Sequence, residues 1–419
     1  MIDAMSGQSY LELFQQQREL IDSGSCQLMN SLRGQAHDSF LKNGFPDTRI
    51  EEYRRSNVSE WFEPDWGMNL SRTPRNRETQ NQDGAFVGSI AEFAEKFPDV
   101  ASVHYGRLAD MEKPGIVAFN TMFVQNGIAV YVPDGVTVKN PVQLISKLEA
   151  SVDVLDNRRV LIVMGANASL RLMLCDRSAS EKKGLTTMVL ESSVGQGAHL
   201  EIYDLEETGT GNTRVAEYYI DQDADSSVEA HFITVHNGKT RNSVFQKFSG
   251  RGSSVRINGA AVLDGTQHVD NQSVVDHRYA DCTSDELFKY VLDNDSVGAF
   301  AGKVLVRPGS NNTVSHQTNR NICLTKSARM FTQPQLEIYA DDVKCSHGST
   351  VGQLDEKALF YMQQRGIPFA EARMLLMLAF LGEVLDQISL ETLKVRLISL
   401  VEKRLRHGES KCDSCQICK

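Results

Sequence analysis

The sequence has little proline, no long apolar run and no leader-like start. Ten prolines in 419 residues argue against long proline-rich linkers. The longest apolar run, Met374 to Leu381, covers eight residues, whereas a membrane-spanning helix needs about 18. The first ten residues contain no basic segment followed by an apolar stretch, so no signal peptide is expected. We therefore expect a soluble cytoplasmic protein, and the length suggests two or three domains.

Basic residues are also fewer than acidic residues. Lys and Arg total 44 against 54 for Asp and Glu, which gives a net charge of −10. Because binding to phosphates needs clustered cations, no nucleic-acid partner is expected, and no membrane partner either. The hydrophobic share of 41% is ample for a large folded core.

The motifs of common enzyme sites are incomplete. Gly238-Lys239-Thr240 has the ending of a phosphate-binding loop, but Ile233 stands where the first glycine is required. Gly195 and Gly197 lack the third glycine of a dinucleotide-binding loop. Neither H-E-x-x-H nor G-x-S-x-G occurs. The residues therefore indicate no nucleotide-binding or hydrolytic site.

Hydrophobic periodicity divides the chain into three regions. Up to about residue 95 the spacing is helical, with one helix expected over Gln27 to Lys42 and ending at Asn43-Gly44. From about 100 to 345 the period is two, as in Leu170, Leu172 and Leu174. Glycine, asparagine and aspartate separate these runs, which predicts an all-β domain.

Periodicity alone leaves three all-β architectures open: a sandwich, a barrel or a solenoid. The length of this region favours a solenoid, since a solenoid can extend in one direction without limit. The pairs Asn126-Gly127 and Asn237-Gly238 are hairpin signals and favour the other two.

The helical period returns from Leu354 to His407. Pro368 suits the first turn of a helix, and Ser389 is a plausible N-cap for a later one. That later helix has one apolar face, formed by Leu390, Leu393, Leu397, Leu400, Val401 and Leu405. On spacing alone, packing of this face against the β domain is favoured over docking of a partner.

Eight cysteines remain to be explained, and in a reducing compartment they are thiols rather than disulfides. Cys345 and His347 are two residues apart, so on a strand they project from the same face. Both can bind Fe or Zn, but two ligands do not complete a site unless a second chain supplies the rest. The residues alone favour a buried cysteine and a hydrogen-bonded histidine.

The last residues contain a C-x₂-C-x₂-C run, formed by Cys412, Cys415 and Cys418. It matches the first three ligands of a ferredoxin-type cluster, without the fourth cysteine. Metal binding and a non-functional tail are equally open. The dispersed cysteines are expected to be packing residues: Cys26, Cys175, Cys282 and Cys323.

Residues 314–368 carry a resemblance. The pieces are QTNRN (317–321), PQLEI-ADDVKCSHG-TVGQLD (334–355) and LFY-QRGIP (359–368). They closely resemble the C-terminal signature of the SufB/SufD family of the SUF iron–sulfur cluster assembly system, in its SufD form. Gly44-Phe45-Pro46 with residues 51–54 resembles the family's entry motif more loosely, with Tyr53 in place of the usual tryptophan.

The resemblance implies a mainly β fold built on a right-handed parallel β-helix. It divides the chain into an N-terminal helical region (1–95), the β-helix (96–347), a C-terminal helical region (348–408) and the cysteine-containing tail (409–419). It also implies a non-catalytic scaffold subunit that pairs with a SufB paralogue and docks a SufC ATPase, where ATP would be hydrolysed. A homodimer of the isolated chain is a further possibility.

The same resemblance assigns site residues. His347 would face a SufB cysteine across the interface and act as a cluster-assembly ligand, with Cys345 in the same motif. The nascent iron–sulfur cluster would be shared transiently with SufB, and no permanently bound cofactor is expected. The ATPase would dock on the C-terminal helical region through Leu359, Phe360, Arg365, Gly366, Ile367 and Pro368.

The resemblance thus favours the opposite interpretation in two places. It favours a ligand role for Cys345 and His347 over a structural one, and partner docking of the apolar helical face over packing. Two alternative functions stay open: a stand-alone metal or iron–sulfur carrier that uses the tail cysteines, and a β-solenoid enzyme acting on polysaccharides.

Overall fold

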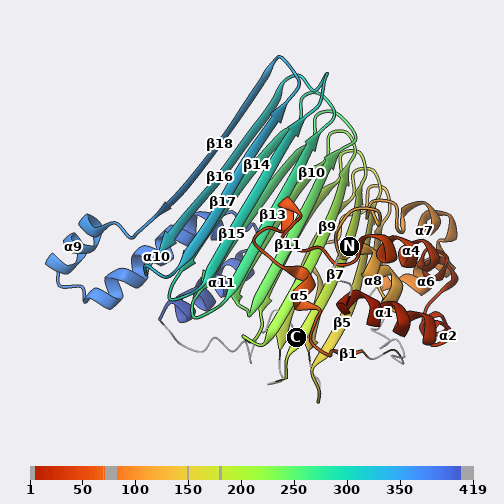
Figure 1. Ribbon diagram of the computed structural model, residues 1–419. Helices are drawn as coiled ribbons and strands as arrows, with labels where there is room; N and C mark the ends of the chain where they lie inside the picture. Colours follow the sequence, from red (N-terminus) through yellow and green to blue (C-terminus); the bar gives the residue numbers. More distant parts are fainter. Residues whose placement is uncertain (1–4, 69, 71–82, 149–150, 179–181, 407–419) are drawn as a thin grey trace.

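A computed structural model describes residues 5–68, 70, 83–148, 151–178 and 182–406. The fold is mainly β, with a parallel solenoid between helices at both ends of the chain (Figure 1). This confirms the expected fold class and selects the solenoid from the three architectures that periodicity left open. The tail cysteines Cys412, Cys415 and Cys418 lie outside the described residues.

Short helices and two short strands precede the solenoid. They are α1 (Met5–Gln16), α2 (Arg18–Ser23), α3 (Gln27–Ser31), α4 (Arg33–Asn43), η1 (Glu51–Tyr53), α5 (Val58–Trp61), β1 (Gly67–Met68), β2 (Phe86–Ser89), α6 (Ile90–Lys96), α7 (Pro98–His104) and α8 (Val117–Phe123). The predicted helix over Gln27 to Lys42 is interrupted at Leu32, and it ends as expected at Gly44, whose φ is 62°. Helices α7 and α8 follow residue 96, so the helical region extends beyond the predicted division.

Sixteen strands, β3 to β18, form the solenoid. They are β3 (Ile128–Val132), β4 (Val142–Leu148), β5 (Val154–Met164), β6 (Ser169–Ser178), β7 (Gly184–Val194), β8 (His199–Glu207), β9 (Asn212–Gln222), β10 (Ser227–His236), β11 (Lys239–Phe248), β12 (Ser254–Leu263), β13 (His268–His277), β14 (Thr283–Leu292), β15 (Val297–Val306), β16 (Thr313–Cys323), β17 (Arg329–Ile338) and β18 (Val343–Gly352). Odd-numbered strands lie in one sheet and even-numbered strands in the other. Strand β18 ends at Gly352, beyond the predicted limit of 347.

One corner of the solenoid is built from left-handed residues that recur at intervals of about 30 residues. They are Gly135, Asn167, Gly197, Asp225, Gly252, Asp281 and Asn312. Glycine, asparagine and aspartate are the residues that adopt a positive φ at least cost. The Asn167 N–H donates to the Gln196 carbonyl oxygen at 2.7 Å, and the Gly197 N–H to the Ala224 oxygen at 2.9 Å. Each corner is therefore hydrogen-bonded to the corner of the next turn.

The hairpin signals do not form hairpins. Asn237-Gly238 connects β10 to β11, which belong to different sheets, and Gly127 directly precedes β3. Among the described strands the antiparallel pair is β2 with β3, and these two are separated by α6, α7 and α8. The hairpin indication fails because a positive φ serves a solenoid corner as well as a tight turn.

The core lies between the two sheets. The residues predicted to alternate, Leu170, Leu172 and Leu174, all point into it. Apolar side chains line much of the interior of the early turns, beside one cluster of charged side chains, whereas polar side chains occupy many inward positions of the last turns, among them Gln317, Asn319 and Asn321. The apolar share of the interior therefore falls toward the C-terminal end.

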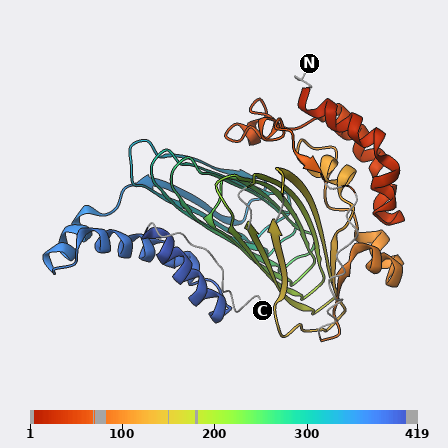
Figure 2. The same cartoon turned by 90° about the horizontal axis from the view of Figure 1, so that it is seen from below.

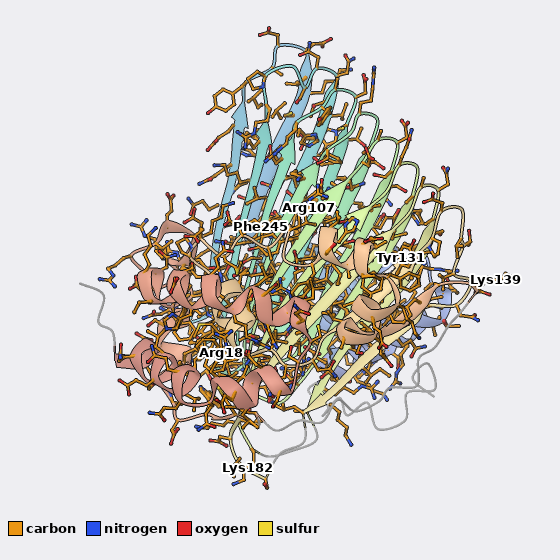
Figure 3. The ribbon with its side chains drawn as sticks, turned by 90° about the vertical axis from the view of Figure 1, so that its right-hand side faces the viewer. Arg18, Arg107, Tyr131, Lys139, Lys182 and Phe245 are labelled. Atoms are coloured by element: carbon orange, nitrogen blue, oxygen red, sulfur yellow. The ribbon has the colours of Figure 1, made fainter. Side chains whose placement is uncertain are left out.

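Helices cover the outer faces of both sheets (Figure 2). The N-terminal region lies on the odd-numbered sheet, and Figure 3 looks at that side, with Arg107 of this region and Phe245 of β11 labelled. Glu191 on β7 accepts the N–H groups of Gly106, Leu108 and Ala109 at 2.9–3.1 Å. A buried strand carboxylate thus holds the loop that leads into α8.

The C-terminal helices α9 (Glu356–Gln364), α10 (Phe369–Leu385) and α11 (Glu391–Leu405) follow β18. The predicted apolar face of α11 is buried against the even-numbered sheet, with Leu397 only 1% exposed. The docking interpretation of this face is therefore wrong, and packing is correct. The N-cap of α11 is Leu390 and not Ser389, whose hydroxyl instead donates to Glu201 Oε2 at 2.6 Å.

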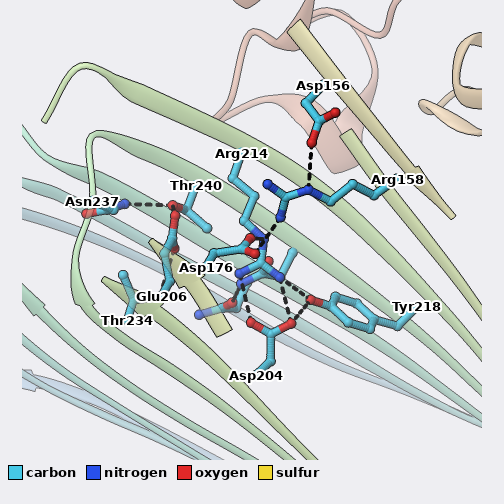
Figure 4. Close-up of polar contacts among 12 residues, drawn as sticks. Asp156, Arg158, Asp176, Asp204, Glu206, Arg214, Tyr218, Thr234, Asn237 and Thr240 are labelled. Atoms are coloured by element: carbon cyan, nitrogen blue, oxygen red, sulfur yellow. Dashed lines mark hydrogen bonds and ion pairs between the residues drawn. The ribbon is translucent and has the colours of Figure 1, made fainter. Parts of the chain in front are cut away.

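A buried cluster of charges lies inside the early turns (Figure 4). Arg214 makes two hydrogen bonds to the Asp204 carboxylate, at 2.8 and 2.6 Å. Arg158 binds Asp156 at 3.0 Å and Asp176 at 2.5 Å. Nearby Glu206 accepts hydrogen bonds from the Thr240 hydroxyl at 2.8 and 2.9 Å.

Burial raises the pKa of Glu206 to about 7, and Arg214 and Thr240 only partly oppose this shift. The unfolded chain releases this proton near its ordinary pKa of 4.5. Folding therefore takes up a proton between about pH 4.5 and 7, and the stability contributed by Glu206 falls as pH rises through this window.

We predict that Glu206→Gln removes this pH dependence. The free energy of unfolding of the variant, relative to the parent chain, should increase by up to about 3 kcal/mol between pH 5 and pH 8. Denaturant unfolding at several pH values measures the difference. Glu112→Gln, on the surface, is the control and should show no such trend. A pH-independent difference for Glu206→Gln would contradict the prediction.

Candidate functional site

The solenoid ends in two uncovered strand edges. Strands β17 and β18 are terminal in their sheets, and each pairs on one side only within the described chain. From Ser346 to Gly352 every residue of β18 is exposed, and β18 forms the free edge of its sheet in Figure 1. An unpaired edge is a template for another strand, and proteins usually protect it. This end of the molecule is therefore suited to an interface.

Cys345 and His347 both belong to the inward-facing row of β18. In the ladder they pair with Ser315 and Gln317 of β16, which are 0% and 1% exposed. Directly paired residues of neighbouring parallel strands point to the same side of the sheet. The structure therefore places the two side chains on the same face, at the mouth of the interior. Ser346 between them points outward, where its Oγ lies 2.8 Å from His316 Nδ1.

The two side chains differ in their surroundings. Cys345 is half-buried, and burial raises the pKa of its thiol above the ordinary value, although a hydrogen bond with the Ser315 backbone opposes the shift. The thiol is therefore protonated at neutral pH and must lose its proton to bind a metal. His347 is exposed, and its ring makes no hydrogen bond to the described residues. The imidazole is free to serve as a ligand from this surface.

Cys345 and His347 do not form a complete metal site. No group of three or more His, Cys, Asp or Glu side chains with metal-binding geometry occurs in the described part of the chain. Iron and zinc sites in proteins commonly use about four protein ligands. Any cluster held at this end would therefore need ligands from beyond these residues.

The predicted docking residues lie together on and beside α9. This helix projects away from the solenoid and has no buried residue (Figures 1 and 2). Phe360 is 62% exposed, and Arg365 donates to the Tyr361 hydroxyl at 2.8 Å. Gly366 has a φ of 84° at the turn into α10, and Pro368 is the N-cap of that helix. Leu359 and Ile367 are half-buried.

The dispersed cysteines are packing residues, as predicted. Cys175 and Cys282 are buried. Cys26 and Cys323 are half-buried and pack against hydrophobic clusters.

The polar residues directly beneath the end of the solenoid were not predicted from the sequence. Gln317, Asn319 and Asn321 of the QTNRN motif line the interior, one turn below β18. Glu286 of β14 lies one turn further down and is 0% exposed. Alternation within QTNRN was a usable signal, but polar residues at alternate positions ordinarily indicate the solvent face of a strand.

No helix among the described residues is both long enough and apolar enough to cross a membrane.

Comparison with known proteins identifies matching families. The model for "SUF system FeS cluster assembly, SufBD core domain" matches residues 147–380, and that for "SufBD protein N-terminal region" matches residues 4–81 and 73–144. The core match covers more than half of the chain, including β5 to β18.

Individual relatives agree with these models. An iron–sulfur cluster assembly SufBD family protein of Synechocystis, slr0076, is 28% identical over 294 residues, which cover 68% of this chain and 65% of the relative. The iron–sulfur cluster assembly protein SufD of Escherichia coli is 32% identical over 184 residues, or 44% of each chain. SufD of Bacillus subtilis is 24% identical over 328 residues, covering 77% of this chain and 74% of the relative. The matches thus span 65% and 44% of the lengths of the first two relatives.

The environment of Cys345 leads to a prediction about its reactivity. Because the thiolate is the reactive form and burial raises the thiol pKa, iodoacetamide should modify Cys345 more slowly than N-acetylcysteine at pH 7.5. The rate should rise about tenfold per pH unit while the thiol is mostly protonated. Peptide mass spectrometry of the folded chain measures the rate, with fully buried Cys282 as the unreactive control. Modification of Cys345 as fast as the free thiol would contradict the prediction.

Proposed function

The chain belongs to the SufBD family of the SUF iron–sulfur cluster assembly system, and from this we propose that it is a SufD-type, non-catalytic scaffold subunit of that system. In this proposal it pairs with a SufB paralogue and docks a SufC ATPase, which hydrolyses ATP. The nascent iron–sulfur cluster is the cargo of the complex and not a resident cofactor of this chain.

One observation carries the proposal: an incomplete ligand pair lies on an unprotected strand edge. His347 and Cys345 are at the mouth of the solenoid, and β17 and β18 beside them lack a second neighbour among the described strands. A paralogue that paired with these edges would bring its own ligands to the same place. Strand addition supplies main-chain hydrogen bonds for affinity, and the inward side chains supply the chemistry.

The projecting helix supports the second partnership. Helix α9 exposes Phe360 and Tyr361 (62% and 59%) although an isolated helix of this length gains nothing from exposed aromatic rings. Aromatic and arginine side chains are the usual anchors of interfaces, and Arg365 lies next to Tyr361. The other two C-terminal helices are committed to the sheet, so α9 and the turn after it are the surface we assign to the ATPase.

We predict that His347→Ala lowers cluster formation about tenfold in a complex co-expressed with SufB and SufC, because a ligand is lost. The fold and the association of the subunits should be unchanged, since the side chain is exposed. Iron and sulfide content and the visible absorption of the purified complex measure cluster formation. His316→Ala is the control, because this exposed histidine is on the neighbouring strand and points outward. An unchanged cluster yield in His347→Ala would refute the ligand role.

We also predict that Phe360→Asp lowers the affinity for SufC about tenfold or more, because a charge would replace an exposed aromatic anchor. Titration calorimetry with purified SufC measures the affinity. Val395→Asp on α11 is the matched control, with 59% exposure and no place in the proposed surface. Equal affinity of the Phe360→Asp variant and the parent chain would show that α9 is not the docking site. Removal of all three helices is a poor test, since α10 and α11 cover the sheet.

A further inference from the structure

Three polar residues form a row beneath the open end of the solenoid. Glu286 on β14 pairs in the ladder with Gln317 on β16, and Gln317 pairs with His347 on β18. Glu286 and Gln317 are 0% and 1% exposed, so the row runs along the inner face of the sheet. Neighbouring strands of a sheet are about 4.8 Å apart. Each side chain is therefore within reach of the next, from the interior up to the mouth.

The lower contact of this row is formed. Gln317 Nε2 donates a hydrogen bond to Glu286 Oε2 at 2.5 Å. Among the described residues the amide oxygen of Gln317, Oε1, is buried without any partner. Other buried amide oxygens in the described chain also lack a partner, among them those of Asn242 and Gln246, but that of Gln317 belongs to the residue paired with His347 in the ladder. The amide nitrogen of Gln317 is therefore bonded to Glu286, and its amide oxygen can accept a further hydrogen bond.

On the opposite sheet, the absence of a side chain at Gly302 leaves space for the Gln317 amide. A Cβ at Gly302 on β15 would lie 2.1 Å from Gln317 Nε2 and 2.6 Å from its Cδ. A side chain at position 302 is therefore incompatible with the observed position of the amide. Burial raises the pKa of Glu286 to about 7, and the hydrogen bond from Gln317 only partly opposes this shift, so keeping a carboxyl group at this position costs stability when it is ionised.

A histidine ligand is usually oriented by a second group. The ring nitrogen that does not bind the metal donates its N–H to a carbonyl or carboxylate oxygen, which selects the tautomer and the ring orientation. His347 has no such acceptor among its described contacts, and Gln317 below it has an acceptor without a donor. Within the described chain, His347 therefore lacks an acceptor for its ring N–H, and Gln317, its partner in the ladder, lacks a donor for its amide oxygen.

We propose that Gln317, oriented by Glu286, is a positioning residue for His347: its amide oxygen accepts the N–H of one ring nitrogen and leaves the other nitrogen to face the interface as a ligand. This inference rests on the proposed ligand role of His347. It also assigns a purpose to the glutamine of the QTNRN motif, which the scaffold function alone does not explain.

The test reads the tautomer of His347 directly. Imidazole ¹⁵N chemical shifts are measured at pH 8 in the full chain labelled with ¹⁵N-histidine, and His347→Ala identifies the signals. We expect one protonated and one bare nitrogen in the parent chain. Gln317→Met, which removes the amide at similar length, should give the averaged shifts of interconverting tautomers. Gly302→Ala, which displaces the amide without changing its chemistry, should do the same.

Two further variants separate positioning from packing. Glu286→Gln keeps an acceptor for Gln317 Nε2 and should preserve the single tautomer, whereas Glu286→Leu should lose it. Asn319→Leu is the matched control, because Asn319 is equally buried on the same strand but pairs with Ser349. Unchanged shifts in Gln317→Met would overturn the inference, and so would an equal change in Asn319→Leu.

Cluster formation in the co-expressed complex is the second readout. We expect Gln317→Met to lower it about tenfold, in the range for partners that orient a metal-binding histidine. If His347→Ala lowers cluster formation and Gln317→Met does not, the positioning role is refuted and the proposed function stands. If His347→Ala has no effect, the ligand role of His347 in the proposed function fails, whatever the tautomer measurement shows.

Discussion

The whole molecule depends on the pairing of each strand with the equivalent strand of the next turn. Backbone N–H and C=O groups need partners, and a parallel stack supplies them on both sides of every internal strand. The left-handed corners extend this pairing between the strands, since Asp225 N–H donates to the Arg251 oxygen in the same way as the corners before it. A stack of this kind has two ends, and the terminal strands there have a row of backbone groups without a neighbouring strand.

The two ends of this stack differ in what covers their terminal strands. At the first turn, the antiparallel strand β2 pairs with β3, and helices α6 and α7 pack beside it. At the last turn, β17 and β18 have no such cover within the described chain. Strand β4 at the first turn also pairs on one side only among the described strands, so the contrast applies to the odd-numbered sheet. The C-terminal end is the one that combines unpaired edges with Cys345 and His347, so the edge of β18 and the ligand pair occupy the same surface.

Buried charged side chains form ion pairs and hydrogen bonds in several other parts of the molecule. Inside the early turns, Arg158 and Arg214 are balanced by Asp156, Asp176 and Asp204, which satisfies charges that would otherwise be costly to bury. On the outer face, strand carboxylates bind backbone N–H groups of the N-terminal region. Near the open end, Glu286 has an amide rather than a cation as its hydrogen-bond partner. This difference makes the polar row beneath His347 distinct from the structural ion pairs deeper in the solenoid.

Local residue spacing was enough to predict the helical ends, the period-two centre and the alternation that directs Leu170, Leu172 and Leu174 inward, because it encodes which side of an element is apolar. The preserved motif around Cys345 and His347 also identified the family and the candidate ligands. The choice between hairpins and stacked turns needed the three-dimensional arrangement, because glycine and asparagine with positive φ serve both. The burial of the α11 face and the inward direction of Gln317, Asn319 and Asn321 in QTNRN needed it too. Those outcomes depend on which strands become neighbours, and contacts about 30 residues apart in sequence leave no local pattern.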